Sequence, residues 1–320
     1  MAISHNIKFA RGTSTKRATT TSTLSAGQPF YETDTHRLYV GATDNTSLKD
    51  MSLQGCFFDA ETVCMLIKAS NLEKASWATI KSVSDMGLGG AVWAVGDTKS
   101  VALSGTVVGQ AVPEVVSAVI IGFDHNSSVE GTGVTFQFGF IDDGEQAKHV
   151  AFVASNYDSY NERGSGFCMN TTDTHVGGWA SSYMKTTICP AFKAVLPSDL
   201  QSVIKTVTKY TDNRGDGKNV TSNVTATSED IFLLSEFEVR GKRLYANSYE
   251  QNYQKQYEYY ANGGSSKKIK YRHDTLAACH WWLRSAKYDS PNHFCRVVTN
   301  GGSGQEWTDV SLGFSPAFVV

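Results

Sequence analysis

The sequence predicts an α+β fold in two parts, a small N-terminal β domain and a larger mixed domain. Short apolar or alternating segments such as 115–123 and 135–140 are typical of strands. The 28 glycines, with abundant threonine, serine and tyrosine, favour strands and turns. The chain ends on Phe318-Val319-Val320, and an apolar end of this kind indicates a strand buried in the core.

Composition narrows the class of protein. The 320 residues are 41% hydrophobic and 19% charged, as in an ordinary globular protein. The formal net charge of -2 gives no basic excess for nucleic-acid binding. Because no apolar run approaches a membrane span and the first residues lack a signal-peptide pattern, we expect synthesis in a cytoplasm without membrane insertion. The six cysteines lack closely spaced pairs, so we expect free buried thiols.

Residues 1–50 are expected to form the small β domain. Residues 7–11 alternate as a strand does, and two further strands, ending at 30–31 and 38–40, flank the turn 32–35 as a β-hairpin. About fifty residues with this little apolar content cannot bury a good core alone. We therefore expect several copies to close one shared β structure.

The larger domain spans residues 51–320. Helical spacing is expected over 57–80, after a linker at 43–56, and the pattern from 77 to 153 is mostly that of strands. Further along, the expected elements are a helix capped by Ser181 or Ser182, a helix over 197–207, a polar loop over 211–228, a buried strand over 230–235 and a tyrosine-rich helix over 245–260.

The first block resembles the N-terminal domain of phage tail and tropism proteins. The matching pieces are Phe9-Ala10-Arg11-Gly12-Thr13, Ala26-Gly27-Gln28-Pro29 and Glu32-Thr33-Asp34-Thr35 with Arg37-Leu38-Tyr39-Val40-Gly41. Gln28 replaces a usually acidic residue. The resemblance implies an intertwined homotrimer over residues 1–50 that attaches the protein to the virion.

The second part resembles the C-type-lectin-like domains found in phages and bacteria. The matching pieces are Trp179 with Ser182, Asp230 to Val239, Trp281-Trp282-Leu283-Arg284-Ser285 and Gly313 to Phe318. Ala286, Phe314 and Ser315 depart from the usual proline, valine and arginine. The core of this resemblance is about 170–320, which leaves residues 51 to about 169 as an embellished first half.

Together the two resemblances imply a bacteriophage receptor-binding protein of the tail fibre, a viral structural protein located in the virion. The implied partners are further copies of the chain, virion proteins of the tail, baseplate or capsid, and a glycan or protein receptor on the host surface. Two alternatives remain open: a structural or decorating head or baseplate fibre protein without a receptor role, and a surface-glycan depolymerase.

The candidate binding residues lie between the two apolar blocks of the last forty residues. Tyrosine, tryptophan and asparagine are typical of adaptable binding loops. The predicted receptor-binding set is Lys287, Tyr288, Asp289, Asn292, His293, Gln305, Trp307 and Asp309. Trp281, Trp282 and Arg284 are expected in the buried frame, since neighbouring strand residues face opposite sides and Arg284 would pair with an internal acid or backbone carbonyls.

No enzymatic activity, cofactor or metal is expected. The sequence holds no nucleophile elbow, P-loop or dinucleotide-binding glycine motif. Cys279, His280, His293 and Cys295 could be drawn as a zinc set, but the adjacent Cys279 and His280 point apart in an extended segment. The stretch 212–217 lacks the acidic third position and the distal glutamate of a calcium loop.

Overall fold

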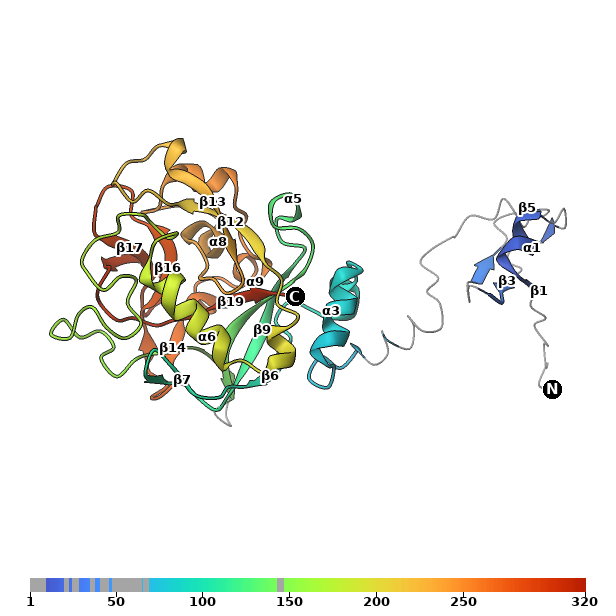
Figure 1. The fold of residues 1–320 in the computed structure, drawn as a ribbon, viewed down its shortest axis with the longest axis horizontal. Coiled ribbons are helices and arrows are strands. Elements are labelled where there is room, and N and C mark those ends of the chain that lie inside the picture. The colour runs from blue at the N-terminus through green and yellow to red at the C-terminus, as the bar shows by residue number, and fades with distance from the viewer. Residues whose placement is uncertain are drawn as a thin grey trace. The chain divides into compact units, whose positions relative to one another are not determined.

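The computed structural model describes residues 10–19, 23–24, 29–34, 38–40, 46–47, 65, 69–142 and 147–320. The chain divides into two compact units, Met1–Lys68 and Ala69–Val320. Among the described residues the fold is mixed α/β, with several sheets and few, short helices (Figure 1). None of these helices is long and apolar enough to cross a membrane.

The first unit contains a three-stranded sheet in the order β1-β3-β4. Its elements are β1 (Ala10–Gly12), α1 (Ser14–Thr19), β2 (Thr23–Leu24), β3 (Pro29–Glu32), β4 (Leu38–Val40) and β5 (Thr46–Ser47). β3 and β4 form the predicted hairpin, in which the buried Phe30 and Tyr39 are paired. Asp34 in the hairpin turn accepts hydrogen bonds from the backbone and hydroxyl of Ser14, at 2.8 and 2.6 Å, which ties the turn to the start of α1.

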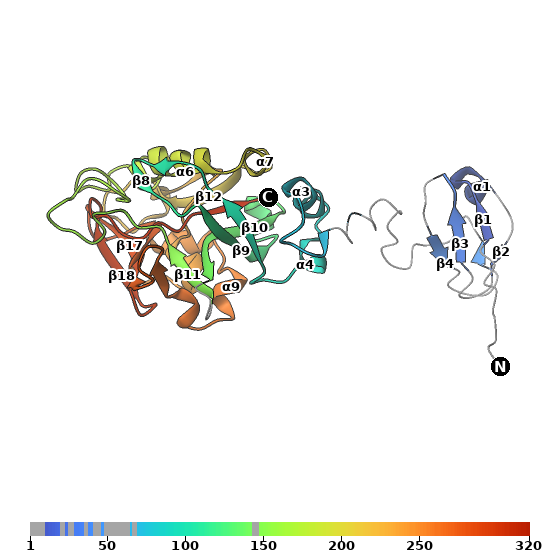
Figure 2. The same ribbon diagram turned by 90° about the horizontal axis from the view of Figure 1, so that it is seen from below.

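The second unit is built on a seven-stranded sheet in the order β15-β14-β11-β10-β9-β6, with β19 also paired to β10 (Figures 1 and 2). Its strands are β6 (Thr98–Ala102), β9 (Val115–Phe123), β10 (Val134–Asp142), β11 (Ala147–Ala151), β14 (Lys270–Arg272), β15 (Ala278–Cys279) and β19 (Ala317–Val319). β19 pairs with the first half of β10, so the predicted burial of the chain's end as a core strand is confirmed.

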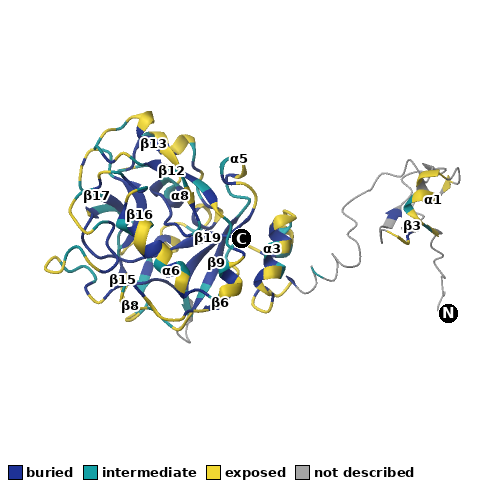
Figure 3. Ribbon diagram, viewed as in Figure 1, coloured by how far each residue is buried: buried dark blue, intermediate teal, exposed yellow. Residues whose placement is uncertain are grey.

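Smaller sheets and short helices surround this sheet. The remaining strands are β7 (Thr106–Val107), β8 (Gln110–Ala111), β12 (Val207–Asp212), β13 (Val224–Glu229), β16 (Trp281–Ala286), β17 (His293–Val297) and β18 (Ser303–Trp307). The described helices are α3 (Trp77–Asp85), α4 (Gly89–Val92), α5 (Ser127–Glu130), η2 (Met184–Ile188), α6 (Cys189–Val195), α7 (Ser198–Gln201), η3 (Thr221–Asn223), α8 (Glu236–Arg240), η4 (Ser248–Asn252), α9 (Glu258–Ala261) and η5 (Ser266–Lys268). In Figure 3 the buried residues concentrate on β16, β19 and the strands of the large sheet.

The core of the second unit is aromatic. Phe318 of β19 stacks on Phe136 of β10 with ring centroids 5.3 Å apart, and Trp77 of α3 meets Phe318 edge-on at 5.9 Å. Phe192 of α6 meets Phe314 edge-on at 5.3 Å. Since these rings come from both ends of the unit's sequence, the core forms only when the C-terminal segment is in place.

Strand β10, which contains the predicted strand segment 135–140, is interrupted at Gly139. The register with β9 shifts between Phe138 and Phe140, and Gly139 has a φ of 122°. A Cβ added there would lie 1.9 Å from the carbonyl oxygen of Val150 on β11. Phe138 is buried in the core, whereas Phe140 is only half-buried and stacks on His149 instead.

The predictions between residues 197 and 228 were partly wrong. The helix expected over 197–207 shrinks to α7, while the loop expected over 211–228 is confirmed at 213–220 and its two ends belong to the β12–β13 hairpin. Lys205 already forms a bridge with Val319 of β19, so the chain is extended there. The threonine-rich segments fit a pleated, half-buried surface, and pairing across the hairpin outweighs the local helical spacing.

The continuous helix expected over 245–260 was also wrong. The segment holds only η4 and α9, because its tyrosines pack one by one against different elements. Tyr253 stacks on Tyr210 of β12 at 4.2 Å, and Tyr257 stacks on His125 at 3.6 Å.

Two further expectations concern the start of the second unit. Of the helix expected over 57–80, residues 57–64 and 66–68 lie outside the described residues, and α3 begins only at Trp77. Helices α3 and α4 also fall within the stretch 77–153, whose pattern predicts mostly strands. Ser182 does bond the backbone N–H of Lys185 at 3.1 Å near the start of η2, as expected of a capping residue.

Candidate ligand-binding surface

Strand β16 begins the last forty residues of the chain, which we call the terminal block, and it is buried. Every residue from Trp281 to Ala286 is buried. The indole N–H of Trp281 donates to the Lys268 carbonyl and that of Trp282 to the Phe167 carbonyl, each at 2.9 Å. Both tryptophans therefore belong to the frame, as the sequence predicts, and neither ring is free to meet a ligand.

A buried charge network, which we call the Arg284 network, ties β16 to α8, β12 and α5. The Arg284 guanidinium donates two hydrogen bonds to the Glu238 carboxylate, one of them at 2.8 Å. The Lys209 ammonium lies 3.2 Å from Glu238 and 2.5 Å from Glu130. Burial alone would raise the pKa of Glu238, but the charges of Arg284 and Lys209 outweigh it and lower that pKa well below its usual value. The internal acid expected for Arg284 is thus Glu238.

The same network contains a cluster that resembles a metal site. The ligand atoms of His125, Glu130 and Glu238 all lie within 4.8 Å of one another. Lys209 already bonds both carboxylates, so its ammonium supplies the positive charge that a metal ion would bring. Burial, reinforced by the nearby Lys209, lowers the pKa of His125 to about 3. We assign the cluster to the frame.

In the same three-stranded sheet as β16, the β17–β18 hairpin carries an exposed aromatic group. Trp307 keeps 37% of its area exposed and Tyr160 keeps 49%. Their rings meet edge to face with centroids 5.7 Å apart. The Arg163 guanidinium lies over the indole at 4.9 Å, and the His293 ring lies 6.0 Å from it. Four side chains from three segments thus converge on one surface.

Ion pairs hold this group in place. Arg163 Nε donates to Asp309 at 2.8 Å, and a guanidinium nitrogen of Arg163 lies 3.4 Å from Asp173. The Asn292 amide also donates to Asp173, at 3.0 Å. The hydrogen bond to Asp309 raises the pKa of Arg163, so the cation stays over the ring at any ordinary pH. We call the following seven residues the Trp307 surface: Tyr160, Arg163, Asp173, Asn292, His293, Trp307 and Asp309.

The Trp307 surface combines apolar faces with hydrogen-bonding groups, as ligand-binding surfaces commonly do. Two aromatic rings at a steep angle offer apolar faces, while a guanidinium, an amide and carboxylates at their edges offer donors and acceptors. Tyr160 is further fixed by its hydroxyl, which donates to Glu306 at 3.0 Å. A ligand meeting these side chains would find them already in position, which lowers the entropic cost of binding.

Four of the eight residues predicted to bind lie in the Trp307 surface, namely Asn292, His293, Trp307 and Asp309. His293 and Trp307 meet because they are paired residues of β17 and β18. Asp309 is buried and ion-paired, so within this surface it positions Arg163.

The other four predicted residues have different surroundings. Lys287 pairs with Asp289, and the Arg243 guanidinium lies 4.9 Å over the Tyr288 ring. Gln305 is half-buried on β18, and its side-chain oxygen accepts no hydrogen bond from the described residues.

Sequence reasoning missed Tyr160, Arg163 and Asp173. All three lie between residues 155 and 178, where no secondary-structure element was predicted. A usable signal is its composition, because residues 155–166 are rich in tyrosine, asparagine, serine and glycine, the residues of adaptable binding loops.

The cysteines are consistent with the expectation of free buried thiols. Cys168, Cys189, Cys279 and Cys295 are all free and buried, whereas Cys56 and Cys64 lie outside the described residues. Within the described part of the chain, the zinc alternative at Cys279, His280, His293 and Cys295 does not gather into a metal cluster.

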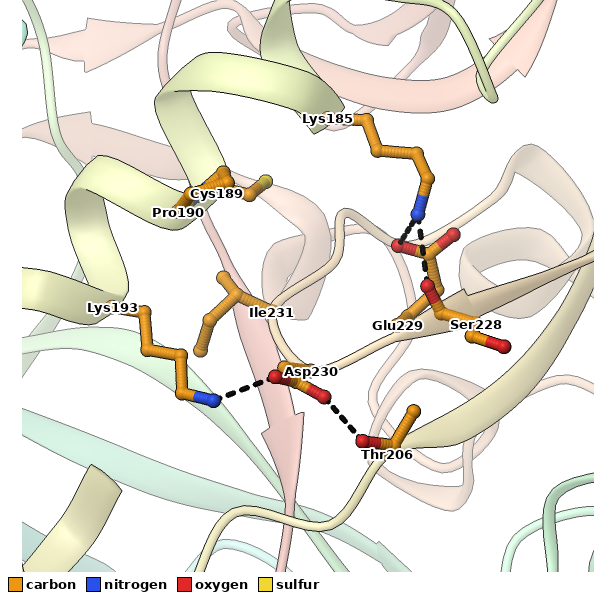
Figure 4. Close-up of a pocket in the computed structure, with 9 residues that line it drawn as sticks. All are labelled: Lys185, Cys189, Pro190, Lys193, Thr206, Ser228, Glu229, Asp230 and Ile231. Carbon is orange, nitrogen blue, oxygen red and sulfur yellow. Dashed lines mark hydrogen bonds and ion pairs between the residues drawn. The ribbon is translucent and has the colours of Figure 1, made fainter. Parts of the chain in front are cut away.

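A hollow of about 290 Å³ lies between α6 and β13 (Figure 4). Lys185 pairs with Glu229 and Lys193 with Asp230, each at 2.6 Å. The Thr206 hydroxyl also donates to Asp230 at 2.5 Å. Because these charges already satisfy one another, a charged ligand would have to break existing pairs, and we give this hollow less weight than the Trp307 surface.

Fold and site together define a mixed α/β protein that presents an aromatic and charged surface on a buried frame. Residues 145–320 match the family described as "Domain of unknown function (DUF6273)", and the match covers more than half of the chain. The chain therefore belongs to the DUF6273 family. No curated protein and no solved structure matches it.

Proposed function

We propose that this protein is a phage receptor-binding protein of the tail fibre, whose C-type-lectin-like domain attaches the virion to a receptor on the host surface. The Trp307 surface is the observation that carries the proposal, because it offers exposed aromatic rings held in a fixed arrangement. The resemblances of residues 9–41 and 179–318 to phage tropism proteins and lectin-like domains support it.

The energetic argument rests on Trp307 and Tyr160. Exposed aromatic side chains dominate the energy of many binding interfaces. Here Arg163 is held by Asp309 and Asp173, so little side-chain freedom remains to be lost when a ligand binds. The neighbouring amide of Asn292 supplies hydrogen bonding at the edge of the apolar faces.

The proposal also assigns trimerisation and virion attachment to residues 1–50. In this role they form a homotrimer and attach the fibre to virion proteins of the tail, baseplate or capsid. The protein is made in the host cytoplasm and then resides in the virion. Three linked copies would convert a weak single-site affinity into strong attachment through avidity.

The test uses the purified full-length chain, fluorescently labelled, on cells of the bacterial host. It should stain the cells and block phage adsorption at saturating concentration. Trp307→Ala should weaken binding by at least about tenfold, since residues of this type often contribute more than about 1.4 kcal/mol. Tyr249→Ala is the matched control, because Tyr249 is an aromatic residue of similar exposure, 38%, outside the surface.

Three outcomes would count against the proposal. Unchanged adsorption at saturating protein would favour a structural or decorating fibre protein. Release of reducing sugars from host envelopes would favour a depolymerase. Full binding by a folded Trp307→Ala variant would remove the Trp307 surface as the site.

A further inference from the structure

Strand β18 is an edge strand, because among the described residues it pairs with β17 alone. The hydrogen bonds at the two ends of this hairpin show which of its backbone groups face β17. At the turn, the Val298 N–H donates to the Gly302 carbonyl at 2.9 Å. At the other end, the Thr308 N–H donates to the Asn292 carbonyl at 3.1 Å. Because bonded and non-bonded pairs alternate along an antiparallel ladder, the even-numbered residues 302–308 face β17, and residues 303, 305 and 307 face outward.

Two of the three outward-facing residues keep their backbone groups free. Those of Ser303 and Gln305 have no hydrogen-bond partner among the described residues. Trp307 is occupied, since its N–H donates to the Glu306 carboxylate at 3.1 Å and its carbonyl accepts from Val310 at 3.2 Å. Gly304 is only half-buried, and because glycine has no side chain, its exposed area belongs to the backbone. The strand therefore presents two N–H and two C=O groups along one open edge.

Side chains cap two other strand edges of the same unit. On β6, at the edge of the large sheet, the Ser100 N–H donates to the Glu73 carboxylate at 2.8 Å. On β13, the Ser228 carbonyl accepts from Lys185 Nζ at 2.9 Å. Caps of this kind protect an edge from pairing with another chain. Among the described side chains, none caps β18 at Ser303 or Gln305, so this edge is open to a partner.

The open edge of β18 leads directly into the Trp307 surface. Trp307 is the last residue of the strand, and its ring meets that of Tyr160 at 5.7 Å. From Ser303 to Trp307 an extended strand covers roughly 14 Å. A ligand of four or so residues that lies along the edge therefore also reaches the exposed rings.

We propose that β18 binds an extended peptide segment of the receptor by strand addition, with the Trp307 surface holding side chains at one end of that segment. This inference rests on the proposed receptor attachment and names the class of receptor, which is a protein. The free groups of Ser303 and Gln305 repeat every two residues, or about 6.8 Å, and the backbone of an added strand presents donors and acceptors at the same repeat. The hydroxyls of a glycan offer no such repeat.

A second copy of this chain fits the edge less well. Antiparallel pairing of β18 with itself requires two-fold symmetry. The homotrimer proposed for residues 1–50 is instead three-fold. The partner is therefore a segment of another protein.

Gln305→Pro and Gln305→Ala form a matched pair of variants. Both remove the amide side chain, whose oxygen accepts no hydrogen bond from the described residues, but only proline removes the outward N–H and places a ring on the edge. Binding of the labelled full-length chain to host cells should weaken at least about tenfold in Gln305→Pro, because a carbonyl of the partner loses its donor. Gln305→Ala should bind as the unaltered chain does. Ser303→Pro and Ser303→Ala should repeat this contrast.

The class of receptor is tested on the cells themselves. Treatment of host cells with proteinase K should abolish staining by the full-length chain. Periodate, which cleaves the vicinal diols of sugars, should leave staining intact. Staining that resists the protease and is lost after periodate would overturn the peptide assignment.

The remaining outcomes separate this inference from the proposed function. Lost attachment in Trp307→Ala with full attachment in Gln305→Pro would keep the proposed function and overturn strand addition. No staining by the unaltered chain would overturn both. Urea unfolding checks the fold of each variant, and misfolding of both proline variants would contradict the outward placement of the two N–H groups. Self-association of the unaltered chain that Gln305→Pro abolishes would make a second copy the occupant.

Discussion

Replacing Arg284 with methionine removes the positive side of a fully buried pair and leaves the rest of its network in place. Glu238 then loses two charge-assisted hydrogen bonds, while the Leu233 carbonyl and Thr211 hydroxyl lose partners at 2.8 and 2.9 Å. Removing one partner of a buried ion pair costs about 3–5 kcal/mol of unfolding free energy. Lys209 remains beside Glu238, so we expect a loss near the lower end of that range.

Urea unfolding of the full chain, followed by tryptophan fluorescence and circular dichroism, measures this loss. Arg243→Met is the matched control, because Arg243 lies over the Tyr288 ring at the surface and should lose less than about 1 kcal/mol. The double variant Arg284→Met/Glu238→Gln should lose less than the sum of its two single variants, since these residues interact directly. Glutamine is chosen because its oxygen can still accept from the Ser235 backbone in the capping box of α8.

A loss below about 1 kcal/mol for Arg284→Met would refute the reasoning. It would mean that methionine packing stabilises the fold as much as the ion pair does, and that the remaining Lys209 fully neutralises Glu238. Strict additivity in the double variant would equally contradict a direct pair.

Three more outcomes are expected from urea unfolding. Burial raises the pKa of Glu250 to about 7, from 4.5 in the unfolded chain. The free energy of unfolding should therefore fall by about 3 kcal/mol as the pH rises from 4.5 to 7. Glu250→Gln should remove this pH dependence from the urea midpoints. Phe318→Ala should cost about 3–5 kcal/mol, because it leaves a cavity against Phe136. Gly139→Ala should cost more than about 1 kcal/mol, because its positive φ and the nearby Val150 carbonyl both oppose a side chain.

The terminal block was predictable because its signals are local. A continuous apolar run at the end of the chain has few alternatives to a buried strand, and adjacent tryptophans before an arginine indicate a packed segment. The sequence argument required only one of Trp281 and Trp282 to be buried. Both are buried because β16 is covered on both faces, and that depends on Phe167 and Lys268 arriving from distant segments.

Helix length was poorly predictable, because contacts with distant segments decide where these helices end. Apolar residues spaced three or four apart over 197–207 satisfy a helical pattern, yet Lys205 is drawn into a bridge with Val319. The tyrosines over 245–260 repeat at about four because separate rings stack on Tyr210 and His125. In both segments tertiary contacts outweigh a local preference of a few tenths of a kcal/mol per residue.

About half of the Trp307 surface was predictable from the sequence. His293 and Trp307 could be anticipated together because a hairpin between two apolar blocks brings its ends into register. Arg163 lies 146 residues from Asp309 in the sequence, and no local spacing reveals such a partner. Long-range side chains that complete a surface are visible only once the fold brings them together.

Arg284 and Arg163 differ in their burial and in the groups that they hold in place. Arg284 is wholly buried, with its charge matched inside the frame, whereas Arg163 keeps 30% of its side chain exposed and holds an exposed ring. Because Trp307 and Tyr160 contribute little to the core, substitutions there should cost less than about 1 kcal/mol of stability. Because the frame does not depend on these outer residues, it should accept many different side chains at positions 160 and 307 without losing the fold.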